Sequence, residues 1–320
     1  MPRASALVAG LLLLAGAFPA QAQYPERMVR IVVPVAAGGG VDVVARILGQ
    51  KLSERLGQQF VVENRPGAAG AIGTKEVARA PADGYTLLYT PSSLVITTIV
   101  NKNAGYDSVK DLSPIINVAI SPYALLLHPS VPATTVQEFI AYAKANPDKL
   151  NYSSAGVGSA SHLGGELLQS MAGVKMQHIP NKGMNPALMD LLGGNVQVLV
   201  GSVPTAASDE KAGRVRAVAV AEKRRSTLMP HLPTIDESGL AGFEVANWHG
   251  LLGPAGMDPR VVKKLHDEII AILDTADVKQ RFETLGFDRV AQSPAEFTAQ
   301  LKSDLERWGD VVRRANVPVN

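Results

Sequence analysis

The 320-residue sequence contains no cysteine. This absence excludes disulfide bonds, thiolate metal sites and cysteine nucleophiles, and also a lipid anchor on an N-terminal cysteine. Aromatic residues make up only 5% of the chain, which disfavours a platform that stacks bases or sugars. Because 31 basic residues stand against 29 acidic ones, no charge excess predicts contact with nucleic acid or a membrane surface.

Long apolar runs are also lacking, except near the N-terminus. Met1–Ala22 carries one charge, Arg3, then an apolar run centred on Leu7–Leu14, and ends in the small-residue pattern Ala20-Gln21-Ala22. This layout predicts a signal peptide over residues 1–22 that is cleaved near Ala22, since the run is shorter than the ~20 residues of a membrane-spanning helix. The mature chain keeps 30 basic and 29 acidic residues, a net charge of +1. We expect a monomeric periplasmic protein held together by its core.

Strand-like and helix-like segments alternate in the first part of the chain. Met28–Val35 has the composition of a buried strand, and Val41–Leu56 has helical spacing of its apolar residues. Phe60–Glu63, Ala71–Ala80 and Tyr85–Tyr89 continue the order as strand, helix and strand. A β-α-β-α-β order predicts a parallel sheet with helices on both faces.

The pattern restarts at the apolar segment Tyr123–His128, and Thr135 with Glu138 forms a capping box for a following helix. Further strands are predicted at Leu150–Ser153, Lys175–Ile179, Val196–Val200 and Val215–Ala221, and helices at His162–Met171, Pro186–Leu192, Pro259–Leu273 and Pro294–Ala315. No flexible linker separates the two α/β units. We therefore expect two lobes with a cleft between them, where small ligands tend to bind.

Gly38-Gly39-Gly40 lies between the first strand and the first helix. Glycines allow close approach of a ligand, and a helix N-terminus presents free N–H groups with a partial positive charge. The segment is not a dinucleotide fingerprint, because Val43 stands where the last glycine of G-x-G-x-x-G belongs. A tight turn without ligand is the alternative. Asp42, in the first helical turn, is better suited to capping N–H groups than to acting as a base.

A second loop of this kind runs from Gly156 to His162 and adds the hydroxyls of Ser159 and Ser161 as donors. Neither serine lies in a G-x-S-x-G elbow, and His162 is better suited to a packing or capping role than to catalysis. Asn181-Lys182-Gly183 is a third loop before a helix, either a plain turn or a ligand contact. One anion-ready loop in each unit predicts a ligand that carries acid groups.

The six histidines are scattered, and none forms H-E-x-x-H or another close ligand spacing. We expect no metal and no cofactor. An exported esterase or dehydrogenase remains an alternative class, although the chain lacks a nucleophile elbow, a metal cluster and a dinucleotide fingerprint.

These motifs, in this order, resemble the Bug family, the TctC-like solute receptors of tripartite tricarboxylate transporters. The resemblance covers nearly all of the mature chain. It rests on segments in both units: Val33–Gly40 with Asp42, Val62–Gly70, Pro81–Leu87, Gly158–Leu163, Lys182-Gly183, Pro186-Ala187, Asp190–Gly194, Pro233-Thr234, Gly242-Phe243 and Trp248-His249-Gly250.

The resemblance implies an α/β, type II periplasmic-binding-protein fold with a ligand cleft between two lobes. Lobe one would comprise residues 23–123 and 222–320, and lobe two residues 124–221, with hinges near Ser121–Leu125 and Ala217–Ala221. The family's function would be capture of a small mono-, di- or tricarboxylate and its delivery to the membrane subunits of the transporter, without catalysis. Carried over, the ligand contacts would be Ala37, Gly38, Gly39, Gly40, Val41, Asp42, Ser92, Ser93, Gly158, Ser159, Ala160, Ser161, His162, Asn181, Lys182, Gly183 and Gly201.

Three positions depart from the family pattern. The family usually has a tyrosine where Asn181 stands, an aspartate at Gln197 and another near Gly201. Asn181 and Gly201 would lie near the distal end of the pocket, so these departures leave the far end of the ligand unspecified. A receptor that presents its closed form to a sensor kinase remains an alternative to transport.

Overall fold

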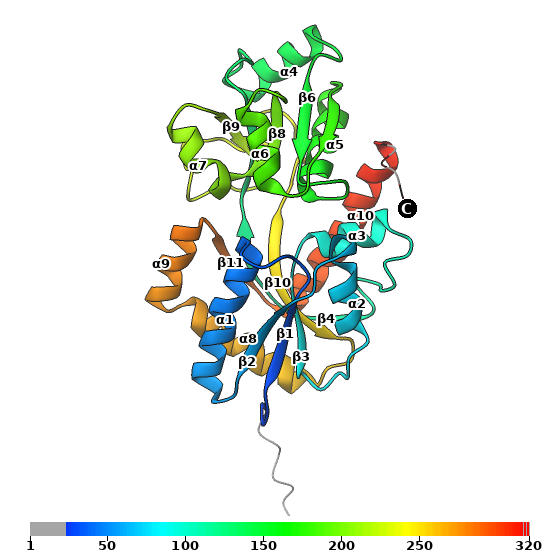
Figure 1. The fold of residues 1–320 in the computed structure, drawn as a ribbon, viewed down its shortest axis with the longest axis vertical. Helices are drawn as coiled ribbons and strands as arrows, with labels where there is room; N and C mark the ends of the chain where they lie inside the picture. The colour runs from blue at the N-terminus through cyan, green and yellow to red at the C-terminus, as the bar shows by residue number, and fades with distance from the viewer. Residues whose placement is uncertain (1–23, 316, 318, 320) are drawn as a thin grey trace, which may run out of the picture.

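The computed structural model describes residues 24–315, 317 and 319, so the predicted signal peptide lies outside the described residues. Two α/β lobes are stacked along the long axis of the molecule, each built on its own sheet (Figure 1). The expected α/β, two-lobed fold is therefore confirmed.

The first sheet has the strand order β11-β4-β10-β3-β1-β2. Its strands are β1 (Val29–Val33), β2 (Phe60–Asn64), β3 (Thr86–Pro91), β4 (Leu112–Ser121), β10 (Asn247–Pro254) and β11 (Asp288–Gln292). The helices of this lobe are α1 (Gly40–Leu56), the short 3₁₀ helix η1 (Ala68–Gly70), α2 (Ala71–Ala78), α3 (Ser93–Val100), α8 (Pro259–Leu273), α9 (Ala276–Leu285) and α10 (Pro294–Arg314).

The second sheet has the order β7-β6-β8-β5-β9. Its strands are β5 (Tyr123–Leu127), β6 (Asn151–Ser154), β7 (Gln177–Pro180), β8 (Val198–Ser202) and β9 (Arg216–Val220). Its helices are α4 (Val136–Ala145), α5 (Ala160–Ala172), α6 (Met184–Leu192) and α7 (Val203–Lys211). The predicted capping box of α4 is present, with Glu138 N–H donating to Thr135 at 3.1 Å.

The predicted parallel arrangement holds for β1, β2 and β3 in the first sheet. The sheet as a whole is mixed, because β10 returns between β3 and β4 and pairs antiparallel with both. The second sheet is mixed as well, since β5 runs antiparallel to β8 and β9. The strands β4, β10 and β11 and the helices α3, α7 and α9 were not predicted from the sequence.

The carboxyl ends of the parallel strands in both sheets face the same gap. β4 ends at Ser121 and the chain enters β5 at Tyr123, which pairs with Ser202 at the end of β8. Beside β4, Asn247 at the start of β10 pairs with Ser121. The crossing between the lobes therefore joins the carboxyl edge of one sheet to that of the other, where ligands bind in open α/β sheets.

Each lobe has its own apolar core, and α10 contacts both. Phe297 and Leu301 of α10 pack with Trp248 in the first lobe, whereas Trp308 and Val312 join the core of the second sheet. The segment 229–245 also packs on the second sheet, through its buried members Met229, Leu232, Ile235, Leu240, Phe243 and Val245. The last turns of α10 thus lie against the second lobe, beside α5 (Figure 1).

Candidate ligand site between the lobes

Helix N-termini from both lobes open onto the gap. In lobe one α1 and α3 follow the carboxyl ends of β1 and β3, and in lobe two α5, α6 and α7 follow β6, β7 and β8. The first N–H groups of a helix have no partner within the helix and carry a partial positive charge. The arrangement can hold an anion by backbone donors from two sides.

The lobe-one glycine loop, residues 37–41, is anchored by a buried carboxylate. Asp42 accepts from the Gly38 N–H at 2.9 Å, from Arg46 Nε at 3.0 Å and from Asn64 Nδ2 at 2.9 Å. Burial alone would raise the pKa of Asp42, but the bonds from Arg46, the Gly38 N–H and Asn64 hold it below its ordinary value. Asp42 therefore acts as an ionised hub that fixes the loop.

This anchoring decides which lobe-one donors remain for a ligand. The Gly38 N–H is used by Asp42. Within the described chain, no hydrogen bond engages the N–H groups of Gly40 and Val41. The first helical hydrogen bond of α1 is the one that the Val43 N–H donates to the Gly39 carbonyl at 3.0 Å. The loop from Ala37 to Gly40 is exposed on the gap side of α1.

The lobe-two glycine loop, residues 155–159, is bonded to the chain beneath it. The Ser159 hydroxyl donates to the Gly156 carbonyl at 2.6 Å and caps α5 by accepting from the His162 N–H. Ser161 Oγ accepts from the Ala155 N–H at 2.9 Å, and His162 Nδ1 accepts from the Gly158 N–H at 3.2 Å. The two serine hydroxyls and the imidazole thus shape the loop from within.

The lobe-two donors that remain belong to the first helical turn of α5. Within the described part of the chain, no hydrogen bond engages the N–H groups of Ala160 and Ser161. His162 is only 4% exposed, so its ring lies beneath the loop. Burial, with the neighbouring His178, lowers the pKa of His162 to about 4, which keeps the ring neutral at pH 7.

Ser92 and Ser93 lie at the start of α3, on the same edge as the lobe-one loop. The buried Ser92 hydroxyl donates to Asn247 Oδ1 at 3.2 Å. In lobe two, Asn181 Nδ2 donates to Asp190 at 2.8 Å, Lys182 is exposed, and Gly183 is the N-cap of α6 with φ of 126°. These segments follow β3 and β7 and therefore border the same gap.

Two of the departures from the family pattern lie at opposite ends of one strand. Gly201 is buried in β8 next to Ser202, at the gap edge of the sheet, and pairs with Ala124. Gln197 precedes the other end of β8, where it accepts from the Asn151 N–H at 3.0 Å and donates to Gly194. The structure therefore places Gly201 near the gap and Gln197 roughly 13 Å away along the strand.

Several residues that shape the site were missed by the sequence reading. Arg46 and Asn64 hold Asp42, and Asn247 holds Ser92. His178 stacks on His162 with ring centroids 4.1 Å apart. Helical spacing places Arg46 four residues after Asp42, a signal that was available. The other partners come from distant strands, which no local pattern reveals.

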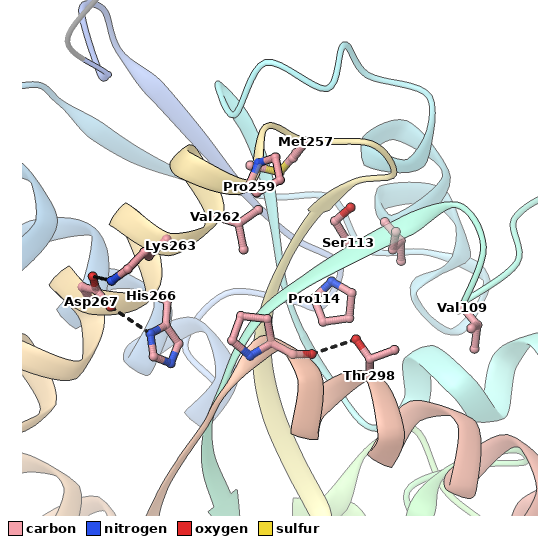
Figure 2. A pocket seen from close by; sticks show the side chains of 12 residues that line it. Val109, Ser113, Pro114, Met257, Pro259, Val262, Lys263, His266, Asp267 and Thr298 are labelled. Carbon is pink, nitrogen blue, oxygen red and sulfur yellow. Dashed lines mark hydrogen bonds and ion pairs between the residues drawn. The ribbon is translucent and has the colours of Figure 1, made fainter.

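A hollow of about 650 Å³ lies elsewhere in lobe one, between the start of β4, α8 and the start of α10 (Figure 2). It includes Pro114, about 23 Å along β4 from the gap-side residue Ser121. Its charged residues are paired with one another, since Lys263 and His266 both contact Asp267 (Figure 2).

Two α/β lobes whose helix N-termini face one gap define a solute-binding protein of the periplasmic-binding type. A family model described as the tripartite tricarboxylate transporter family receptor matches residues 44–317, and the chain therefore belongs to this family. The resemblance drawn from the motifs is confirmed. None of the described helices is long and apolar enough to cross a membrane.

Relatives and solved structures resemble the chain over almost its whole length. BugT of Bordetella pertussis is 35% identical over 317 residues, covering 98% of this chain and 97% of that protein. The structure of R. palustris Rpa4515 with adipate has a TM-score of 0.81 at 34% identity, covering 92% and 99% of the two chains. MatC from Rhodopseudomonas palustris with bound malate has a TM-score of 0.76 at 32% identity, covering 90% and 100%.

Proposed function

We propose that this chain is a periplasmic receptor that binds a small carboxylate between its lobes and delivers it to the membrane subunits of a tripartite tricarboxylate transporter. The observation that carries the proposal is the set of free N–H groups at the starts of α1 and α5, which face one gap from opposite lobes. The adipate and malate bound by two solved relatives support the ligand class.

The ligand contacts in this proposal are backbone donors above all. Gly40 and Val41 would donate from lobe one, and Ala160 and Ser161 from lobe two, to carboxylate oxygens. Such charge-assisted bonds are stronger than neutral ones and need no cationic side chain. Ser93 and Lys182, which also belong to the predicted set, border the same gap. The chain would bind its ligand without catalysing a reaction, as expected for a family of receptors.

Closure would follow rotation of the two lobes about the strands that join them. The prediction from sequence divides the chain into residues 23–123 with 222–320 and residues 124–221. We propose that the chain re-enters lobe one at Asn247, because the buried residues between 229 and 245 pack on the second sheet. The signal peptide would end near Ala22, and the mature monomer would start near Gln23, one residue before Tyr24.

The test is thermal stabilisation of ligand-free protein, refolded or extensively dialysed, by a panel of mono-, di- and tricarboxylates that includes adipate and malate. A ligand at 100 times its Kd stabilises the native state by about 2.7 kcal/mol, which shifts the melting temperature measurably. Adipamide, a neutral analogue of adipate, serves as the matched control and should cause no shift. The proposal fails if sugars or nucleotides raise the melting temperature and no carboxylate does.

Delivery to the transporter is tested separately, by capture of membrane subunits from the native host on immobilised receptor. The ligand-saturated protein should retain them more strongly than the ligand-free protein. Retention of a sensor kinase in their place would reassign the receptor to signalling.

A further inference from the structure

Three aromatic rings form a column beneath the lobe-two glycine loop. Tyr152 of β6 stacks on His178 of β7 with ring centroids 4.8 Å apart, and His178 stacks on His162 of α5 at 4.1 Å. The column fits because α5 carries Gly165 against the Tyr152 ring. A Cβ on Gly165 would overlap the Tyr152 ring.

Each imidazole of the column supports one glycine of the loop. His162 Nδ1 accepts directly from the Gly158 N–H at 3.2 Å. His178 Nε2 lies 2.7 Å from Ser154 Oγ, and the same Oγ accepts from the Gly156 N–H at 3.1 Å. Both glycines have positive φ, 123° at Gly156 and 78° at Gly158, so their N–H groups are turned inward by a backbone that other residues rarely adopt.

The bonding pattern assigns the protonation of His162. A nitrogen that accepts an N–H carries no proton, so neutral His162 must hold its proton on Nε2, which lies 3.9 Å from Glu166. Ser154 Oγ accepts from the Gly156 N–H and lies 2.7 Å from His178 Nε2 and 3.3 Å from the Gly156 carbonyl oxygen, so this hydroxyl links His178 to Gly156 whichever of the two receives its proton. Protonation of His162 on Nδ1 would replace that acceptor by a donor and break its bond with the Gly158 N–H.

We propose that His162 and His178 are positioning residues that hold the lobe-two loop in its ligand-binding conformation through the Gly158 and Gly156 N–H groups. The proposal rests on the proposed binding of a carboxylate at the start of α5. It assigns the ligand contact to the N–H groups of Ala160 and Ser161, and it removes the His162 ring from the ligand contacts. The loop thus has its ligand-binding conformation before the ligand binds, which reduces the entropy cost of ordering the loop on binding.

The groups that face the two rings come from β6 and α5. Tyr152 donates its hydroxyl to Glu166, and the burial of Glu166 raises the pKa of that carboxyl. Burial lowers the pKa of His178 to about 4, as it does for His162. Because one imidazole lies on the other, a charge on either ring also disfavours a charge on its neighbour.

The first experiment uses the ligand-free full-length mature protein, so it is independent of the proposed function. Nitrogen-15 NMR at pH 7 should show His162 as the Nε2–H tautomer. The amides of Gly156 and Gly158 should be protected from hydrogen exchange, unlike those of Ala160 and Ser161. An Nδ1–H tautomer at His162, or an unprotected Gly158 amide, overturns the proposal.

The second experiment uses matched variants and adipate as the probe. Asparagine places an acceptor oxygen where His162 has Nδ1, and glutamine places one where His178 has Nε2, whereas phenylalanine keeps a ring without an acceptor. His162→Phe and His178→Phe should weaken adipate binding about five- to tenfold in calorimetry, the equivalent of one lost hydrogen bond. His162→Asn and His178→Gln should restore affinity to within about twofold.

The two proposals fail in different ways. If adipate does not bind the wild-type protein and the other carboxylates also fail, the proposed function falls, while the His162 tautomer and glycine protection still decide the positioning role. If adipate binds and the phenylalanine and amide variants lose affinity equally, the rings serve packing alone and the positioning role is overturned. Circular dichroism and melting temperatures of all four variants confirm that each is folded before its affinity is compared.

Discussion

The two glycine loops that face the gap are held by different chemistry. In lobe one an ionised carboxylate, Asp42, accepts from the loop and from Arg46. In lobe two the neutral ring of His162 accepts directly from Gly158, and His178 contacts Ser154, which accepts from Gly156. The Asp42 anchor needs its group charged and the His162 anchor needs its ring uncharged, so acid should separate them.

The buried polar groups beneath the two loops also differ between the lobes. In lobe one the hydroxyl of Tyr89 and both ring nitrogens of His249 are buried without a partner among the described residues. In lobe two the hydroxyl of Tyr152 donates to Glu166 and the imidazoles are bonded to the loop. A buried polar group that is satisfied fixes structure, whereas one without a partner costs stability. The buried polar groups near the loop are therefore better satisfied in lobe two than in lobe one.

The largest expected difference is in the response to acid. His162 has an ordinary pKa of 6.5 that the fold lowers to about 4, so the stability it contributes above pH 6.5 is lost as the pH falls from 6.5 to about 4. The full loss from this ring corresponds to about 3 kcal/mol. The pKa of Asp42 is held below 3.8, so its contribution survives that range and is lost only at lower pH. Hydrogen exchange of the Gly158 and Gly38 amides, corrected for intrinsic rates, should show Gly158 opening first.

The control for this titration is His162→Asn, which keeps an acceptor for Gly158 without a titrating ring. Its Gly158 amide should stay protected further into the acid range, with the remaining dependence due to His178. Opening of Gly38 and Gly158 at the same pH would show that the two anchors do not differ as described.

Gly165→Ala should have the next largest effect, because it pushes the column out of place. A Cβ at this position would lie 2.7 Å from Cδ2 and 2.9 Å from Cζ of the Tyr152 ring. Overpacking of this kind costs about 2 kcal/mol. Urea denaturation should show that loss, while Ser170→Ala, at an exposed position of the same helix, should change stability by less than about 0.5 kcal/mol. Equal urea midpoints for Gly165→Ala and Ser170→Ala would mean that the column accommodates the added methyl group without loss of stability.

Much of the fold follows from local pattern. The apolar strand segments near Met28 and Phe60, the helical spacing after Val41 and the capping box at Thr135 are all found where they were predicted. β10 and β4 were missed, because each runs through the middle of a sheet and their polar members, such as Asn117, are buried by partners from elsewhere in the chain. A pattern along one segment cannot report such long-range pairing.

The positions of the glycine loops could likewise be predicted, since a strand, a glycine and a helix start suffice to indicate a site of free N–H groups. Their anchors could not. His178 lies on the short strand β7, and only the parallel pairing of β6 with β7 brings it to Tyr152 and Ser154. The sequence also indicated Ser159 and Ser161 as donors to a ligand, whereas the structure uses both hydroxyl oxygens inside the loop.

Tyr152→Phe should cost about 1.5 kcal/mol, less than the overpacked variant, because it removes one bond to a carboxylate and leaves Glu166 buried without that donor. The ring itself, and its stacking on His178, are kept. Urea denaturation checks the value, and Tyr142→Phe, at a partly exposed position of α4, is the matched control that should stay near the wild type. An unchanged midpoint for Tyr152→Phe would show that this hydroxyl does not stabilise the column.

Tyr89→Phe, the equivalent change in lobe one, should have the smallest effect and the opposite sign. Its hydroxyl is fully buried and has no partner among the described residues, so removing it relieves a desolvation cost and raises the free energy of unfolding by up to about 1 kcal/mol. Calorimetric unfolding at pH 7 measures the gain. A loss of stability would mean that Tyr89 has a partner in solution, and a loss confined to the adipate-bound protein would place that partner in the ligand site. Either result would reduce the difference between the lobes, because the Tyr89 hydroxyl would then be satisfied, as the Tyr152 hydroxyl is.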